Sequence, residues 1–292
     1  MYVRSRDDSL TFRHRLVPPA AVVSRQAQET RMTTGDNPLH EAIRWEGDIR
    51  PLIRTGLDID QQNAHHMTPL YVAVYQDNRD AVQALLAAGA NTAITGVENR
   101  FPLDEAIHQA RIDIALDLIA AGAPMLPTSL VDAVRLYDPK PALALIARGA
   151  DPNIQQIGTS NRPIHFAAQG APIAIMKALI DAGAQLNHRD ARQHTALMNA
   201  AYDGLEEHTA LLLRSGAEPS LADQQGRTPL AVAVMRNRPK VVEALLAHPL
   251  GRATIDQPNR AGITPLQIAR LDGRADLVDL LIGAEQTQEQ ER

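Results

Sequence analysis

The sequence contains no cysteine, and it has only one Trp, three Phe and five Tyr among its 292 residues. Without cysteine it can form no disulfides and no thiolate metal sites, and it has no need of an oxidising compartment. It also lacks the roughly eighteen consecutive apolar residues that a membrane-spanning helix requires. These absences predict a cytoplasmic protein with no transmembrane segment.

Basic residues are also in the minority, and the formal net charge is −5. Residues 1–32 hold six Arg against three acidic residues, so the remainder has 23 basic and 31 acidic residues. Nucleic-acid binding needs a basic face that displaces counterions from phosphate, so we expect no nucleic-acid ligand. A partner protein with a basic surface suits the acidic excess better.

Two short markers recur along the chain at one period. Successive copies of the glycine marker, from Gly56 to Gly216, are separated by 33, 33, 27, 34 and 33 residues. A repeat of this length indicates a solenoid. Thr-Pro-Leu begins at Thr68, Thr228 and Thr264, with degraded copies at Asn37, Phe101, Arg162 and Thr195. The second marker, Gly-Ala after an aliphatic pair, lies at Gly89, Gly122, Gly149, Gly183, Gly216 and Gly283.

Each marker has a physical role at a helix end. A Thr hydroxyl can cap a free backbone N–H, and Pro at the first helical position gives up a donor that has no partner there. Gly after the aliphatic pair supplies the left-handed conformation that ends a helix. About twenty residues between the markers fit two short helices with a turn near Asp77, Asp203 or Asp272. The polar stretch that follows predicts a hairpin-like finger.

These features resemble the ankyrin family, whose repeat carries the signature T-P-L-H-x-A. Versions of the signature occur at residues 38–42 and 163–167, and a version without His occurs at residues 68–73. The resemblance implies an all-α ankyrin-repeat solenoid of helix-turn-helix pairs with finger loops and a concave binding face. We count about eight repeats, and the compact, Ala-rich units resemble bacterial members. The repeats begin near residues 37, 68, 101, 128, 162, 195, 228 and 264.

The repeats extend over residues 36–284. Residues 1–35 fit no repeat; they could be disordered, could form a targeting peptide, or could remain untranslated if synthesis starts at Met32. Residues 285–292 are polar, and we expect them to form a fraying tail.

Two units depart from the pattern. In the fourth unit, residues 124–127 must cross directly to the next helix, so we expect no finger there. In the eighth unit, extra residues at 248–252 predict a longer or irregular finger.

No pattern in the sequence indicates catalysis. Nucleophile elbows, phosphate-binding loops and H-E-x-x-H motifs are missing, so we expect no enzyme, no cofactor and no metal. His40 and His165 occupy the signature position and should tie one repeat to the next by hydrogen bonds. The adjacent His65 and His66 fit a solvated finger tip better than a metal site, because their side chains diverge.

In proteins that resemble this one, partners are held by finger residues and by exposed positions near the end of the first helix. We therefore expect a monomeric scaffold that binds another protein, with inhibition of an enzyme or toxin as a sharper version of the same function. Trp, Tyr and Arg, which dominate many interfaces, are frequent at the corresponding positions. These candidate residues are Arg44, Trp45, His65, Met67, Tyr75, Glu98, Arg100, His108, Arg135, Arg192, Tyr202, Asp203, Arg227 and Arg236.

Overall fold

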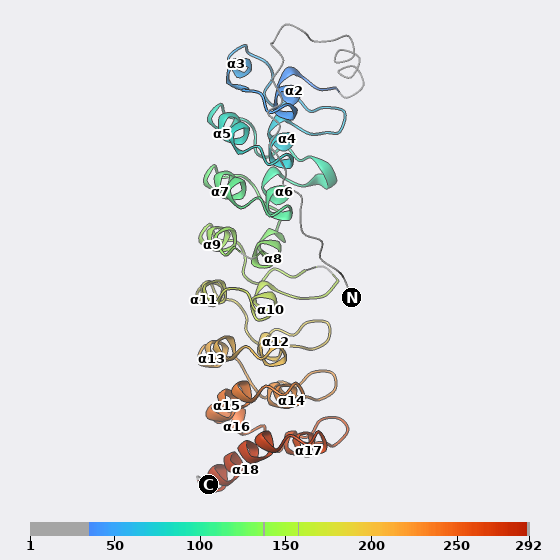
Figure 1. Ribbon diagram of the computed structural model, residues 1–292, viewed down its shortest axis with the longest axis vertical. Coiled ribbons are helices and arrows are strands. Elements are labelled where there is room, and N and C mark those ends of the chain that lie inside the picture. The colour runs from blue at the N-terminus through green and yellow to red at the C-terminus, as the bar shows by residue number, and fades with distance from the viewer. Residues whose placement is uncertain (1–34, 137, 157, 291–292) are drawn as a thin grey trace, which may run out of the picture.

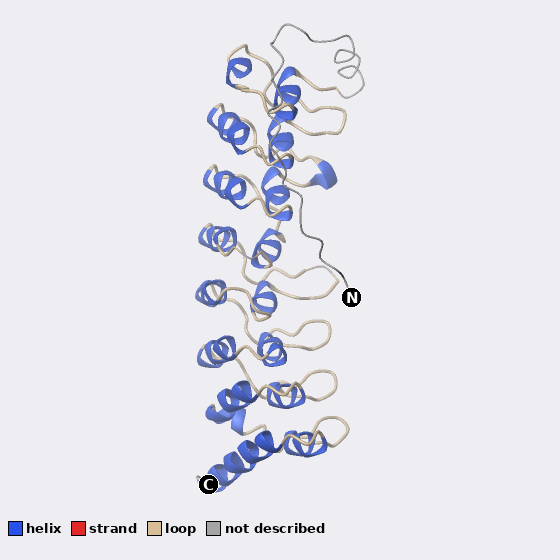
Figure 2. Ribbon diagram, viewed as in Figure 1, coloured by secondary structure: helices blue, strands red, loops and turns tan. Residues whose placement is uncertain are grey.

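The protein is a stack of helix pairs along one long axis (Figure 1). The computed structural model describes residues 35–136, 138–156 and 158–290. Helices and loops make up all of this described part, without strands (Figure 2). The prediction for the N-terminal segment falls on residues 1–34, which lie outside the described residues.

The two helices of each pair form two parallel columns, with the finger loops on the side of the first helices (Figure 1). The first helices are α2 (Pro38–Arg44), α4 (Pro69–Tyr75), α6 (Pro102–His108), α8 (Ser129–Val134), α10 (Pro163–Ala167), α12 (Ala196–Asp203), α14 (Pro229–Met235) and α17 (Pro265–Leu271). The second helices are α3 (Arg50–Ile53), α5 (Arg79–Ala87), α7 (Ile112–Ala120), α9 (Lys140–Ala147), α11 (Ile173–Asp181), α13 (Glu206–Arg214), α15 (Pro239–Ala247) and α18 (Ala275–Gln290). Two short elements, η1 (Val97–Asn99) and α16 (Pro249–Arg252), complete the set.

The sequence markers lie at the helix ends as expected. The Thr68 side chain accepts a hydrogen bond from the Tyr71 backbone N–H at 3.2 Å, and Thr228 caps α14 in the same way. After the second helices, Gly89 and Gly149 both have φ of +83°, a conformation that costs a residue with a Cβ atom. The helix starts and stops predicted at these positions are therefore confirmed.

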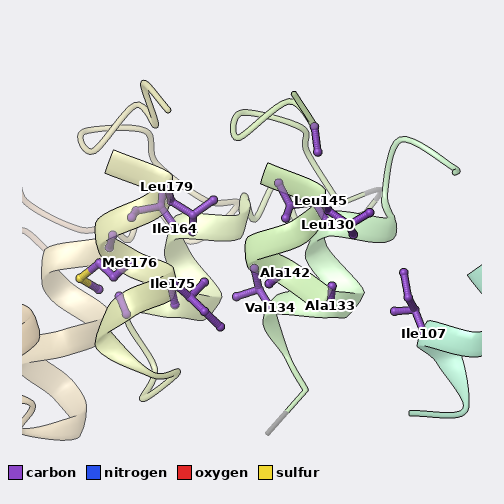
Figure 3. Close-up of a cluster of buried hydrophobic side chains, with 14 of the residues drawn as sticks. Ile107, Leu130, Ala133, Val134, Ala142, Leu145, Ile164, Ile175, Met176 and Leu179 are labelled. Atoms are coloured by element: carbon purple, nitrogen blue, oxygen red, sulfur yellow. The ribbon is translucent and has the colours of Figure 1, made fainter. Parts of the chain in front are cut away.

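Aliphatic side chains fill the space between successive pairs. Figure 3 shows Leu130, Leu145, Ile164 and Leu179 among side chains that α8, α9, α10 and α11 contribute to one continuous core. Each of these four is at most 1% exposed. Because each pair buries its apolar face only against its neighbours, the stability of the stack depends on contacts between adjacent repeats.

The fingers are loops whose tips are closed by backbone hydrogen bonds between residues four or five positions apart. The N–H of Asn63 donates to the Met67 carbonyl at 3.0 Å, and Asp223 donates to Arg227 at the same distance. A side-chain oxygen of the same Asn63 or Asp223 accepts two further backbone N–H groups inside its loop. Between α7 and α8 the chain crosses through residues 121–128 without such a projecting loop (Figure 1).

Two sequence-based expectations near the C-terminal end were wrong. The extra residues at 248–252 were expected to make the finger longer or irregular, but they form helix α16 ahead of it, because Pro249 supplies a favourable first helical position. Gly283 does not end a helix, since α18 continues to Gln290. Residues 285–290 therefore belong to a helix and not to a fraying tail. The residues after Gly283 are mostly Ala, Glu and Gln, which favour helix despite their polarity.

Candidate functional site

A groove of about 860 Å³ crosses α10, α12 and α14 and the fingers beside them. First-helix ends form its floor, and finger loops form its wall. We refer to this hollow as the groove. Its lining residues are Gly158, Thr159, Asn161, Gln169, Asp190, Ala191, Arg192, His194, Met198, Asn199, Tyr202, Asp203, Arg227, Val232, Met235 and Arg236.

Many lining residues stand at equivalent positions of neighbouring repeats. Tyr202 near the end of α12 and Met235 at the end of α14 stand at the same repeat position, and Asn199 and Val232 share a position about one turn earlier. Because successive repeats are stacked with similar geometry, one sequence register generates a continuous row across several units. The groove is therefore a product of the repeat itself, with a different side chain in each unit.

An aromatic ring and a guanidinium group stack at the centre of this row. The Arg236 guanidinium carbon lies 4.0 Å from the ring centroid of Tyr202, within the range of a cation–π interaction. Tyr202 is still 47% exposed. The Arg238 side chain donates to the Tyr202 carbonyl at 3.2 Å, which ties the end of α12 to the next repeat. The stacked pair is thus held in place while one side of it faces solvent.

A buried ion pair shapes the next finger. The Arg227 Nε donates to the Asp223 carboxylate at 2.6 Å, and the Asp223 side chain is completely buried. Burial alone would raise the pKa of Asp223, but hydrogen bonds from the side chain and backbone of Arg227 outweigh it and hold the pKa below its usual value. His194 from the preceding finger lies 3.7 Å from the same carboxylate. Asp223 therefore acts as a structural anchor for the finger wall.

Two other charged residues of the groove, Arg192 and Asp203, are more accessible. Arg192 is exposed on its finger, where its backbone N–H donates to Asp190 at 2.8 Å. Asp203 is exposed at the end of α12. Partial burial raises the pKa of Asp203, although the nearby Arg238 and Arg236 lower it in part.

The structure brings five of the fourteen predicted binding residues into the groove: Arg192, Tyr202, Asp203, Arg227 and Arg236. The others lie nearer the N-terminal end of the stack or on other fingers, outside the groove. Trp45 and Tyr75 are 76% and 54% exposed, as a contact surface requires. The predicted residues outside the groove are Arg44, Trp45, His65, Met67, Tyr75, Glu98, Arg100, His108 and Arg135.

Some of these outer residues already have partners within the chain. Arg44 forms an ion pair with Asp36. Arg100 contacts Glu98 at 2.6 Å and Glu105 at 3.4 Å. Such intramolecular pairs leave these arginines fewer free donors for a partner.

Two others are tied to apolar neighbours. Met67 is half-buried and packs against the hydrophobic core. The guanidinium of Arg135 lies 5.5 Å from the ring centroid of Phe166. His65 and His108 are exposed, each on a different repeat.

The signature histidines make the predicted hydrogen bonds between repeats. His40 Nε2 lies 2.9 Å from the Met67 carbonyl, and His165 Nε2 lies 3.1 Å from the His188 carbonyl. Burial lowers the pKa of both imidazoles. In the described residues no group of three or more His, Asp or Glu side chains is arranged to hold a metal ion.

Sequence reasoning missed the floor residues Met198 and Asn199. Asn199 occupies the variable position of the signature, between the His position and the Ala. Its side-chain amide donates to the His165 carbonyl at 3.3 Å, so it joins two repeats where it borders the groove. A polar residue at that variable position, inside an otherwise apolar helix, was the available signal.

Comparisons with known proteins agree with this architecture. A family model for ankyrin repeats matches residues 39–126, 130–223 and 197–290. The B-cell lymphoma 3 protein homolog of Mus musculus is 30% identical over 244 residues, covering 77% of this chain and 53% of that protein. The human B-cell lymphoma 3 protein is 28% identical over 243 residues, covering 77% of this chain and 52% of its own.

A plant protein, the E3 ubiquitin-protein ligase XBAT32 of Arabidopsis thaliana, is 29% identical over 189 residues, covering 54% of this chain and 37% of the ligase. The chain thus spans about half the length of the two B-cell lymphoma 3 proteins that it matches. These three relatives are eukaryotic, so the resemblance to bacterial members remains a prediction. The ankyrin-repeat family model matches most of the chain, and the helix pairs are stacked as such repeats are. The chain therefore belongs to the ankyrin-repeat family.

Proposed function

We propose that this protein binds another protein through its first-helix ends and finger loops, with the groove as the main contact. The observation that carries the proposal is the Tyr202–Arg236 stack, an exposed aromatic and Arg pair fixed at the centre of a hollow. Tyr and Arg are among the residues that contribute most to protein interfaces, and a fixed pair loses little conformational entropy on binding. In the described residues no helix combines the length and apolar composition needed to cross a bilayer.

The exposed residues Trp45 and Tyr75 extend this surface toward the N-terminal repeats in the proposal. Tyr75 stands at the same repeat position as Tyr202, and Trp45, one position further along its repeat, directly follows α2. Trp45 is 76% exposed, and Trp is one of the residue types that contribute most to protein interfaces. We therefore expect two regions of contact, one at these aromatics and one at the groove. The proposal assumes a cytoplasmic monomer with about eight repeats.

Photo-crosslinking tests the main contact. A crosslinking amino acid in place of Gln169, an exposed groove residue, should trap the partner in a lysate of the native organism. The same amino acid in place of Glu243, exposed on α15, is the control and should trap nothing specific. Tyr202→Ala combined with Arg236→Ala should abolish the crosslink from position 169. An undiminished crosslink in that double variant would contradict the proposal.

Inhibition of a partner enzyme or toxin is the second candidate function. The excess of acidic over basic residues across the repeats favours it, because such a surface attracts a basic protein. Purified protein would then reduce the activity of the captured partner at equimolar concentration. If the partner is captured but keeps its full activity, inhibition is refuted and only the scaffold function remains.

A further inference from the structure

The charges that line the groove differ in accessibility. Two carboxylates, those of Asp190 and Asp203, and three guanidinium groups contribute to its lining, whereas Asp223 does not line it. Asp223 is sealed from solvent and paired with Arg227. Asp190 is 9% exposed, and its carboxylate accepts backbone N–H groups of Arg192 and His194 at 2.8 and 2.7 Å. The carboxylates of Asp190 and Asp223 are therefore both occupied in holding the finger loops.

The two exposed arginines of the groove have no comparable partner. In the part of the chain that the structure describes, neither Arg192 nor Arg236 lies within ion-pair distance of a carboxylate. Asp203 is the exposed carboxylate of the lining. The solvent-facing side of the groove thus carries two guanidinium groups without an ion-pair partner among the described residues against one carboxylate, that of Asp203, although the whole chain is acidic.

Stacking prepares Arg236 to receive an anion. A guanidinium that lies on an aromatic ring keeps its N–H groups free at the edge of its plane, in the fork geometry that matches a carboxylate. The guanidinium carbon of Arg236 lies 4.0 Å from the centroid of the Tyr202 ring, and this contact restricts the side chain, so less conformational entropy is lost on binding than for a free side chain. Met235 lies in the same groove at 36% exposure and offers an apolar contact beside the stack.

We propose that the groove binds an extended segment of the partner protein through an Asp or Glu side chain of that segment. Arg236 receives the carboxylate, Arg192 adds positive charge from the finger, and an apolar neighbour of the acidic residue packs on Met235. This inference rests on the proposed function and specifies the chemistry of the partner. The negative charge of the whole chain does not oppose it, because salt limits charge interactions to about 8 Å under physiological conditions.

Selection from a library of random linear peptides displayed on phage tests the inference without knowledge of the partner. Peptides selected on the wild-type protein should be enriched in Asp and Glu next to an apolar residue. Replacing the acidic residue of a selected peptide by its amide should weaken its Kd by about tenfold. The same replacement should have little effect on binding to the double variant Arg192→Gln and Arg236→Gln.

The matched control carries the same loss of charge away from the groove, at Arg50 and Arg214. It should retain both the affinity and the preference for acidic peptides. Thermal melts of both double variants show whether each is folded, and the substituted side chains are exposed, so the melts should match. Peptides that bind in the groove, lose affinity with Tyr202→Ala, but show no acidic enrichment would overturn this inference and leave the proposed function standing. A library that yields no peptide dependent on Tyr202 would overturn both.

Discussion

The imidazole of His165 in α10 meets that of His188 edge to face, with ring centroids 5.7 Å apart and planes at 85°. His165 Nδ1 accepts the backbone N–H of Arg162 at 3.1 Å, so its Nε2 carries the proton toward the His188 carbonyl. His188 Nε2 in turn lies 3.1 Å from the Ser160 carbonyl. Two neutral rings thus connect two successive fingers to the helix between them.

Acid should weaken this connection. Burial lowers the pKa of His165 and of His188 in the folded protein, whereas the unfolded chain keeps the ordinary value near 6.5. As the pH falls below about 6.5, the unfolded chain takes up protons first, so stability present at neutral pH is lost. The melting temperature measured by circular dichroism should fall between neutral pH and about pH 5. His165→Asn should flatten that pH dependence, while His65→Asn on an exposed finger should keep the wild-type slope. Equal slopes in both variants would refute the assignment to His165.

At the crossing between α7 and α8, where there is no finger, the Asp104 side chain of α6 links its repeat to the next one by hydrogen bonds. Its carboxylate accepts the backbone N–H groups of Leu126 at 3.0 Å and Phe101 at 3.2 Å, and it bonds the Ser129 hydroxyl. Asp104→Ala would leave buried donors unsatisfied and should lower the free energy of unfolding by about 1–3 kcal/mol. Asp104→Asn keeps one acceptor oxygen and should cost less. Urea titration measures both, with the exposed Asp256→Ala as a neutral control.

Gly96 lies against the buried ring of Tyr71. A Cβ atom at residue 96 would come within 2.6 Å of two ring carbons. Gly96→Ala should therefore reduce stability by about 1–3 kcal/mol through overpacking. The cost should shrink in a Tyr71→Leu background, where the ring is gone, and a double-mutant cycle of unfolding free energies measures that coupling. Additive effects would show that the ring is not the obstacle.

Alanine substitutions of a buried and of an exposed leucine should differ sharply in their effect on the free energy of unfolding. Leu145 is fully buried between helix pairs, whereas Leu271 is 76% exposed at the end of α17. Leu145→Ala should cost about 2–5 kcal/mol of unfolding free energy, because it removes buried methyl groups and leaves a cavity. Leu271→Ala should change little. A similar cost for the two variants would argue against packing between neighbouring repeats as the source of stability.

The helix boundaries were predictable because they depend on local chemistry. Thr68 and Gly89 act on backbone groups within one helical turn, so the sequence near them is sufficient. Gly283 has the same sequence context on its N-terminal side, yet it lies inside α18, because the residues that follow it favour helix. A helix stop thus requires a turn-forming continuation as well as glycine.

The groove was predictable only in part, because its position depends on contacts between units. The exposed end of each first helix is visible in the sequence register, and Tyr202 and Arg236 were identified in that way. Their stacking depends on the distance between adjacent repeats, which no local pattern contains. The ion pairs of Arg44 with Asp36 and of Arg100 with Glu105 form within single repeats, and they depend on how the finger folds back on the first helix.

The row of finger loops is interrupted at residues 121–128, where the chain crosses directly from α7 to α8 (Figure 1). Fingers before it belong to repeats that carry Trp45 and Tyr75, and fingers after it form the wall of the groove. Within the described residues, no hydrogen bond joins a finger before the crossing to a finger after it, so the loops on either side can be exchanged or lengthened separately. The molecule has two independently adjustable halves on a single continuous helical support.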